Sequence, residues 1–299
     1  MHDIGWGDYQ AFLAIARHGQ LARAARASGV DATTMGRRLR RLESRLGTSL
    51  FEQTREGQQL TEAGEALLAA VETMAQAAAA IGDSRGTGAG PAGTVRLSVS
   101  EGFGTWVIAP EVADLHRRYP GLTLDLVASS GFLSPSRREA DIAVMLSRPK
   151  AGPVVARRLS DYALRLYAGA DYLAQAGVPT TPEDLARDHR LIGYIPDLLY
   201  APELRYLSEV RPDLALNARS SSITAQYRMI SAGAGIGVLP CFIGDADPAL
   251  VPLLPEVRIT RTFWLVTHRD TQTVPRVRAV KDWLVEVARG ARRRLVPEA

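Results

Sequence analysis

Five arginines crowd into one short stretch near the start of the 299-residue chain. They are Arg37, Arg38, Arg40, Arg41 and Arg45. Only one acidic residue, Glu43, lies among them, and two hydroxyl groups, Thr33 and Thr34, precede them. Guanidinium groups bind phosphates, and short polar side chains reach base edges in the major groove, so the group suits DNA binding. A solvated basic surface also explains the charge, and the neighbouring elements must decide between the two.

The stretch that carries these arginines has the periodicity of an α-helix. Met35, Leu39, Leu42 and Leu46 recur at steps of four, three and four, which places them on one face. We expect Asp31 to cap the start of the helix and Gly47 to end it in a left-handed conformation. The apolar stripe then directs the arginines outward.

The segments around this helix predict a winged helix-turn-helix. Apolar spacing predicts one helix over 9–18, capped by Asp8 and built on Tyr9, Phe12, Leu13 and Ala16, and a second over 21–28. A short helix before a longer basic helix is typical of DNA-binding proteins. Two apolar ends around Gly57, over 50–60, predict a β-hairpin wing.

A long helix is predicted to follow the wing. Leu60, Leu67, Val71, Met74, Ala78 and Ile81 repeat at steps close to a coiled-coil seam. We favour pairing of this seam between two subunits, although packing on the helix's own domain is also compatible with so few heptads. The glycine-rich stretch 82–93 predicts a flexible linker.

The remaining chain alternates strands and helices, which predicts a mostly parallel sheet covered on both faces. Apolar strands are expected at 95–99, 122–126, 142–146, 163–168, 191–194 and 235–239, and a final helix at 274–289. A second lobe is expected to begin near Ala163, with a return to the first lobe near Phe263. Two α/β lobes joined in this way enclose a cleft, which is a usual place for a small ligand.

Composition narrows the class of protein. The formal net charge is +4, so a nucleic acid partner is permitted but not required. A single cysteine, Cys241, excludes an internal disulfide and a cysteine metal cluster. Because no apolar run approaches a membrane span and the first residues lack signal-peptide features, we expect a cytoplasmic protein with no membrane partner.

Several motifs resemble the LysR-type transcriptional regulators. The sharpest lie in the first 65 residues: the Ala24-Ala25 pair, the RRLRRLE of Arg37 to Glu43, and the LTEAG of Leu60 to Gly64. Later segments fit too, including ADIAVML at Ala140 and AGAGIGVLP at Ala232. The resemblance implies an α/β protein with an N-terminal winged helix-turn-helix, a linker helix, and a two-lobed effector domain like a type 2 periplasmic-binding protein. We expect these to be residues 1–61, 62–92 and 93–299, with lobe 1 at about 93–162 and 267–299 and lobe 2 at about 163–266.

The resemblance also implies site residues and partners. Promoter or operator DNA is expected to meet Thr33, Thr34, Gly36, Arg37, Arg38, Arg40, Arg41, Gln53 and Arg55. Glutamine is common in the family at Ala32, serine at Gly36, and arginine at Gln53 and Glu56, so this chain departs there. The expected assembly is a homodimer or homotetramer that senses a small-molecule effector.

The effector cleft is expected to collect hydroxyls and amides from the ends of strands and helices. The candidates are Ser100, Gly102, Phe103, Ser129, Ser130, Ser147, Tyr194, Ser221 and Ser222. Such groups suit a carboxylate or another polar metabolite, although any single serine is more often a helix cap. Glu101, in the same loop, disfavours an anionic ligand if it points inward.

An enzyme is the alternative interpretation, as a helix-turn-helix fused to a catalytic α/β domain. The four histidines after His2 are scattered, and no His-x-x-x-His pair or Gly-x-Ser-x-Gly elbow is present. The glycines of 233–237 lack nucleotide-loop spacing, and close backbone packing explains them better. We therefore expect no catalytic residue, no metal site and no cofactor.

Overall fold

A computed structural model describes residues 4–54, 57–84, 90–129, 131, 133–137 and 139–298. The chain forms two compact units, Met1–Thr87 (unit 1) and Gly88–Ala299 (unit 2). Each unit is described by itself. Along the described ranges, no helix is long and apolar enough to cross a membrane.

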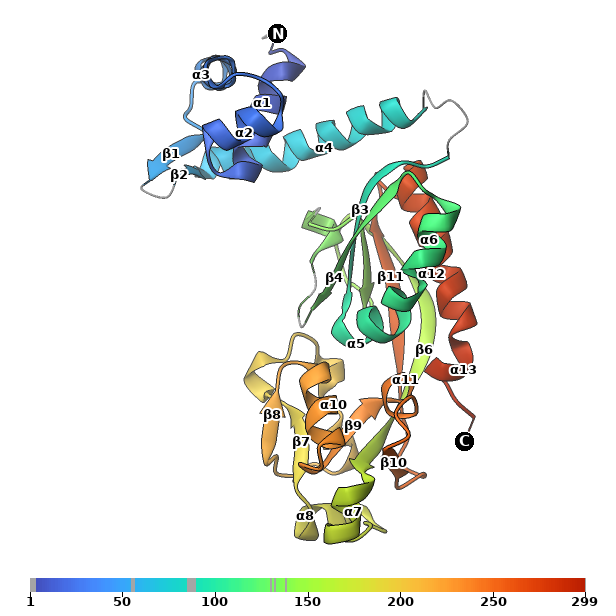
Figure 1. Ribbon diagram of the computed structural model, residues 1–299. Coiled ribbons are helices and arrows are strands. Elements are labelled where there is room, and N and C mark those ends of the chain that lie inside the picture. Colours follow the sequence, from blue (N-terminus) through green and yellow to red (C-terminus); the bar gives the residue numbers. More distant parts are fainter. Residues whose placement is uncertain are drawn as a thin grey trace. The chain divides into compact units, whose positions relative to one another are not determined.

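Unit 1 has the predicted order of elements (Figure 1). They are α1 (Trp6–His18), α2 (Leu21–Ala27), α3 (Ala32–Leu46), β1 (Phe51–Thr54), β2 (Gly57–Leu60) and α4 (Glu62–Ser84). One core holds them together, and Phe12, Ile15 and Leu42 are fully buried in it. The arginine-rich helix is therefore fixed by its apolar stripe to the two helices before it.

Helix α3 begins and ends as predicted. The Asp31 carboxylate accepts a hydrogen bond of 2.7 Å from the Thr34 amide, and Gly47 follows the helix with φ 68°. The buried stripe is shorter than expected, because Leu46 is 39% exposed. It ends one turn earlier, at Leu42.

The first turn of helix α1 differs from the prediction. It begins at Trp6 rather than Tyr9, and Asp8 is not its cap but a side chain inside the helix that is only 2% exposed. A carboxylate at this position is tolerated because Arg41 of α3 forms an ion pair with it. The buried face also includes Ala11 and Ile15, and Tyr9 packs against the core half-buried, whereas Ala16 is not among the residues in that core.

The wing is a short antiparallel hairpin, as predicted. Phe51 pairs with Leu60, and Thr54 pairs with Gly57. The Gln58 amide donates a hydrogen bond of 2.8 Å to the carbonyl oxygen of Gly19, which fixes the hairpin to the turn after α1. A Cβ on Gly57 would lie 2.4 Å from that same oxygen, so this approach requires glycine.

Helix α4 packs partly on its own unit. Val71 is fully buried, and Leu67 packs against the same core. Met74 and Ala78 remain exposed. The intrachain alternative therefore holds for the first half of the seam, while the second half presents a free face. The side chain of Ile81, the linker residues 85–89, Arg55 and Ser130 lie outside the described residues.

Unit 2 is built on one nine-stranded sheet in the order β4-β3-β5-β11-β6-β9-β7-β8, with β10 also on β6. The strands are β3 (Gly93–Ser100), β4 (Leu122–Ser129), β5 (Ile142–Met145), β6 (Val154–Gly169), β7 (Leu191–Tyr194), β8 (Ala218–Ser220), β9 (Ile236–Pro240), β10 (Leu250–Leu253) and β11 (Ile259–His268). The pairs toward both edges are parallel, as expected, whereas the central pairs with β6 and β11 are antiparallel. The sheet is therefore mixed.

The two lobes share β6 and β11, which run between them in opposite directions (Figure 1). Strand β6 is continuous over sixteen residues, so the expected lobe boundary near Ala163 falls inside a strand. Long strands of this kind connect two lobes without a loop. Lobe 1 is then the part around β3, β4 and β5, and lobe 2 the part around β7, β8 and β9.

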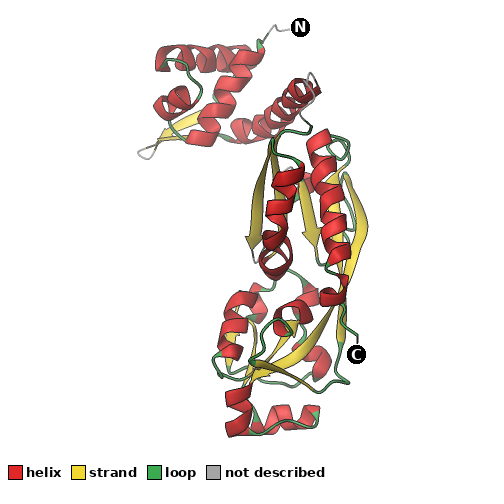
Figure 2. Cartoon of the chain, turned by 45° about the vertical axis from the view of Figure 1, so that its right-hand side comes forward, coloured by secondary structure: helices red, strands yellow, loops and turns green. Residues whose placement is uncertain are grey.

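Helices flank the strands in both lobes (Figure 2). Lobe 1 has α5 (Glu101–Phe103), a π turn (Gly104–Ile108), a 3-10 turn (Ala109–Glu111), α6 (Val112–Arg118), α12 (Pro275–Gly290) and α13 (Arg292–Leu295). Lobe 2 has α7 (Ala170–Ala176), α8 (Pro182–Asp188), α9 (Leu207–Val210), α10 (Ile223–Ser231) and α11 (Cys241–Gly244). Short 3-10 turns lie at Pro135–Arg137, Pro196–Leu198 and Pro202–Leu204. The helical stretch from Glu101 to Arg118 is irregular, and Pro110 within it has no amide hydrogen to donate.

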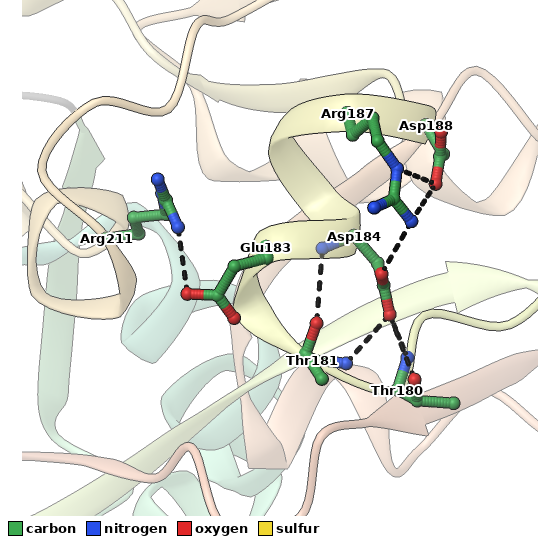
Figure 3. Close-up of polar contacts among 7 residues, drawn as sticks. All are labelled: Thr180, Thr181, Glu183, Asp184, Arg187, Asp188 and Arg211. Atoms are coloured by element: carbon green, nitrogen blue, oxygen red, sulfur yellow. Dashed lines mark hydrogen bonds and ion pairs between the residues drawn. The ribbon is translucent and has the colours of Figure 1, made fainter.

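Helix α8 of lobe 2 has a hydrogen-bonded cap at its N-terminus (Figure 3). The Thr181 hydroxyl accepts a hydrogen bond from the Asp184 amide, and the Asp184 carboxylate accepts from the amides of Thr180 and Thr181. These hydrogen bonds, foremost the one from the Thr180 amide, lower the pKa of Asp184 to about 2. Arg211 reaches Glu183 at 2.8 Å and joins the helix to a later loop.

Close backbone packing explains the glycines near 235, as expected. A Cβ on Gly235 would lie 2.4 Å from the Arg190 carbonyl oxygen, and one on Gly237 would lie 2.6 Å from Ile230. Neither glycine opens a helix, because β9 begins at Ile236. This segment is a buried strand, not a nucleotide loop.

Candidate DNA-binding surface and effector cleft

The outer face of α3 presents the expected polar residues. Thr33, Arg37 and Arg40 are exposed, while Thr34 and Gly36 are half-buried. Within the described residues, neither Arg37 nor Arg40 takes part in an ion pair. Their positive charges are therefore available to a phosphate or a base.

Two other arginines of α3 face α1. The Arg41 Nε lies 2.8 Å from a carboxylate oxygen of Asp8, and its Nη2 contacts the other oxygen. This hydrogen bonding raises the pKa of Arg41. The Arg38 guanidinium lies 3.5 Å from the position that a Cβ on Gly7 would take. Arg41 is thus engaged inside unit 1, which weakens the expectation that it meets DNA.

A hollow of about 420 Å³ separates α3 from the wing. Thr33, Gly36 and Arg40 line it on one side, and Gln53 and Gln58 line it on the other. The Oε1 atom of Gln58 is buried and has no hydrogen-bond partner among the described residues. Gln58 was not among the predicted residues, since nothing in the wing sequence distinguishes it from Gln53.

The cleft of unit 2 is lined mainly by aromatic rings. Four of the residues proposed for the effector line it: Ser100, Gly102, Phe103 and Tyr194. So do Leu146, Tyr162, Tyr200, Leu204, Tyr206, Ile223, Pro240, Phe242 and Phe263. These side chains leave a cavity of only about 20 Å³, which is room for about one water.

Of the serines expected in the cleft, only Ser100 is among the described residues that line the cavity. Ser129 donates a hydrogen bond of 2.6 Å to the Gly131 carbonyl, and Ser222 caps α10 by accepting from the Ala225 amide. Ser147 and Ser221 are not among the described residues that line the cavity. Because Ser129 and Ser222 are used by a turn and a cap, and aromatic rings line the cavity, the cleft is more aromatic than the prediction had it.

Glu101 connects the two lobes. Its carboxylate accepts a hydrogen bond of 2.8 Å from the Ser222 hydroxyl and one of 3.0 Å from the Ile223 amide. Glu101 belongs to α5 of lobe 1, whereas Ser222 and Ile223 begin α10 of lobe 2. The carboxylate therefore sits where the helix dipole favours negative charge.

The same carboxylate influences the nearby tyrosines. Burial is the main cause that raises the pKa of Tyr200, and the negative charge of Glu101 adds to it. The pKa of Tyr194 is also raised, mostly by burial and partly by Tyr206, Tyr200 and Glu101. Both hydroxyls stay protonated at neutral pH. The sequence signal for this arrangement was Glu101 alone, because the tyrosines lie in distant segments.

A second cavity of about 220 Å³ lies in lobe 2 next to the first. Tyr194, Leu204 and Tyr206 line both cavities. Leucines supply much of the remaining wall, with Leu199, Leu207, Leu214 and Leu216. Among the described residues, no group of three metal-binding side chains comes together.

Comparison with known proteins gives the family. Residues 6–65 match the family described as bacterial regulatory helix-turn-helix protein, lysR family. Residues 88–289 match the LysR substrate binding domain. The chain belongs to the LysR family. It is a DNA-binding transcriptional regulator with an effector-binding domain, and no observation supports the alternative of a fused catalytic domain.

Characterised relatives in this LysR family are similar along nearly the whole chain. The Mau operon transcriptional activator of Paracoccus denitrificans is 31% identical over 95% of this chain and 96% of its own length. The regulator PtxR of Pseudomonas aeruginosa is 30% identical over 92% of this chain and 90% of its own. These relatives are named transcriptional regulators.

Solved structures agree with the fold of this LysR-family chain. The structure of CrgA from Neisseria meningitidis is 26% identical, with a TM-score of 0.60 over 94% of this chain and 98% of that one. The CrgA regulatory domain is 29% identical and covers 66% of this chain and 98% of its own, with a TM-score of 0.59. A structure of full-length CbnR complexed with its target DNA is 17% identical, with a TM-score of 0.64, and speaks for the fold alone.

Proposed function

We propose that this regulator binds promoter or operator DNA with the outer face of α3 and with the wing. Thr33, Arg37 and Arg40 meet the major groove, and Gln53 reaches the backbone from β1. The observation that carries this proposal is that Arg37 and Arg40 are exposed on α3 without an ion pair among the described residues, and that Arg40 lines the hollow between α3 and the wing. The apolar face of α3 packs on the core of unit 1, so guanidinium groups on its opposite face can bind base edges and phosphates.

The test measures how tightly two arginine-to-alanine variants bind one selected DNA duplex and one scrambled duplex. The duplex is first selected from a random-sequence library by the full-length protein. Arg37→Ala is expected to weaken binding to the selected duplex by about 1–3 kcal/mol and to relax base preference. Arg40→Ala is expected to weaken both duplexes and to lower the salt slope by about one phosphate contact. If both variants lost the same affinity for the selected and the scrambled duplex, α3 would not recognise the DNA sequence.

We also propose that α4 pairs two subunits through its exposed second half, giving a homodimer or a homotetramer. Met74 is 41% exposed, whereas Val71 is fully buried in its own unit. Met74→Lys is therefore expected to split the assembly and leave the fold intact, as measured by sedimentation and circular dichroism. An unchanged sedimentation coefficient would place the interface elsewhere. Glu65→Lys, an exposed change on the same helix, serves as the control.

The effector domain is proposed to bind a small molecule in the cleft between the lobes and to leave it unchanged. The aromatic cavity beside Glu101 supports this proposal, together with the match to the LysR substrate binding domain. A ligand that raises the melting temperature should be recovered intact after long incubation. Turnover of that ligand would instead favour an enzyme. The site of action is proposed to be the cytoplasm, where promoter DNA is available.

A further inference from the structure

The position in the cleft that best suits an anion is already filled by the protein itself. Helix α10 begins with Ser222, and its hydroxyl and the Ile223 amide both donate to the Glu101 carboxylate. A helix N-terminus attracts one negative charge, and here that charge comes from the opposite lobe. A ligand carboxylate at this point would have to displace Glu101 or lie beside it, where like charges repel.

The rest of the cleft has the composition of a cation-binding cage. The stacked rings of Tyr162 and Phe263 lie 4.1 Å apart, and Phe103 is 4.4 Å from Phe263. Tyr194 and Tyr206 meet edge to face at 6.0 Å. Among the described residues that line this cavity there is no lysine, arginine or histidine.

Aromatic faces carry partial negative charge and attract cations, and most strongly where water is excluded. The Tyr206 ring already attracts one cation from outside the cavity: the Arg261 guanidinium lies 6.0 Å from the ring centroid, and Arg261 also pairs with Glu209. The Glu101 carboxylate lies beside the cavity, because its chain neighbours Ser100 and Gly102 line the cavity and so does Ile223, whose amide donates to it. The electrostatic preference of the cleft is therefore for positive charge.

We propose that the effector is an organic ammonium ion, held by the aromatic rings of the cleft with Glu101 as its counter-ion. This inference rests on the proposed function, since it names the ligand class of the same cleft. The ammonium group fits the cavity of about 20 Å³ near Glu101. A carboxylate has about four acceptor positions, so Glu101 can keep its two hydrogen bonds and accept another.

The second cavity accommodates the apolar part of such a ligand. It has a volume of about 220 Å³, its wall is rich in leucine and also contains Arg205 and Arg211, and Tyr194, Leu204 and Tyr206 line both cavities. Tyr194 lines both cavities and is partly exposed, whereas Tyr162 is buried. In this proposal, rotation of the Tyr194 ring joins the two cavities. An alkyl chain then extends into lobe 2 while the charged end stays near Glu101.

The experiment uses the full-length protein and three probes of equal length: butylammonium chloride, butanol and sodium butyrate. Affinity is measured by calorimetry and by melting temperature at constant ionic strength, in wild type, Glu101→Gln and Tyr194→Leu. Glutamine keeps an acceptor for Ser222 and removes the charge, while leucine keeps apolar bulk and removes the ring. Glu111→Gln, on the irregular helix that follows Glu101, is the matched control.

Butylammonium is expected to bind wild type and Glu111→Gln more tightly than either other probe. Glu101→Gln should weaken that binding about tenfold or more, and Tyr194→Leu should weaken butylammonium more than butanol. The inference is overturned if butyrate binds as tightly as butylammonium, if no probe binds, or if both variants leave ammonium affinity unchanged. Binding to the selected duplex is measured in parallel. A protein that binds the duplex but no ammonium refutes this inference alone, whereas failure to bind any duplex refutes the proposed function.

Discussion

The two ligand surfaces of this protein are built in opposite ways. The proposed DNA-binding face takes most of its residues from one helix, α3, and turns two arginines outward. The proposed effector cleft of unit 2 takes its wall from segments spread between Ser100 and Phe263, and the nearby Glu101 carboxylate is hydrogen-bonded to the other lobe. The first surface is open and cationic. The second is nearly closed and aromatic.

This difference follows from how each surface meets its ligand. DNA is large and highly charged, so a rigid helix with exposed guanidiniums suffices and needs no cavity. A small ligand must be surrounded, and surrounding it requires side chains from several strands and helices. In both places an acidic residue stabilises the arrangement, with Asp8 paired to Arg41 in unit 1 and Glu101 bonded to Ser222 in unit 2.

The sharpest way to separate the two regions is to damage the core of one of them. Leu42 is fully buried beneath α3, so Leu42→Ala is expected to destabilise unit 1 by about 2–5 kcal/mol. Calorimetry should show a lower melting transition for unit 1 and an unchanged one for unit 2. Leu46→Ala, in the same helix but 39% exposed, is the control and should have a much smaller effect. A single transition that shifts as a whole would mean that the units unfold together.

A smaller expected change in melting temperature and salt slope distinguishes an arginine that stabilises the fold from one that binds DNA. Arg41→Ala leaves the buried Asp8 without its partner, so the melting temperature should fall while the salt slope of DNA binding changes little. Arg40→Ala should do the reverse. The comparison fails if Arg41→Ala leaves stability unchanged and lowers the salt slope instead. The double variant Asp8→Asn with Arg41→Ala should recover part of the lost stability.

The smallest expected effect concerns acid stability in lobe 2. The pKa of Asp184 is lowered to about 2 by hydrogen bonds from Thr180 and Thr181. A carboxyl with a lower pKa in the folded state stabilises the fold above the unfolded pKa, and this stabilisation is lost as pH falls from about 4 toward 2. Asp184→Asn should therefore lose less stability than wild type over that range, as followed by melting temperature. Asp188→Asn on the same helix is the control, and an equal change in both would refute the assignment to Asp184.

The local sequence predicted much of unit 1. Met35, Leu39 and Leu42 gave the buried face of α3, and Asp31 and Gly47 gave its ends, because a helix repeats over a few residues. The start of α1 was missed, since the burial of Asp8 depends on Arg41, which lies thirty-three residues away. In α4 the spacing alone did not distinguish packing within the unit from pairing between subunits.

For unit 2 the sequence by itself predicted strands β3, β4, β5, β7 and β9 and part of β6, whereas β8 and β10 were not expected. The predicted strands depend on neighbours within a few residues. Only the tertiary structure decided the character of the cleft. Serines expected there are consumed by local turns and caps, and rings from distant strands occupy the space instead. The reason is physical: a short hydroxyl finds its hydrogen-bond partner nearby, whereas a large ring lies wherever the packed sheet leaves apolar volume.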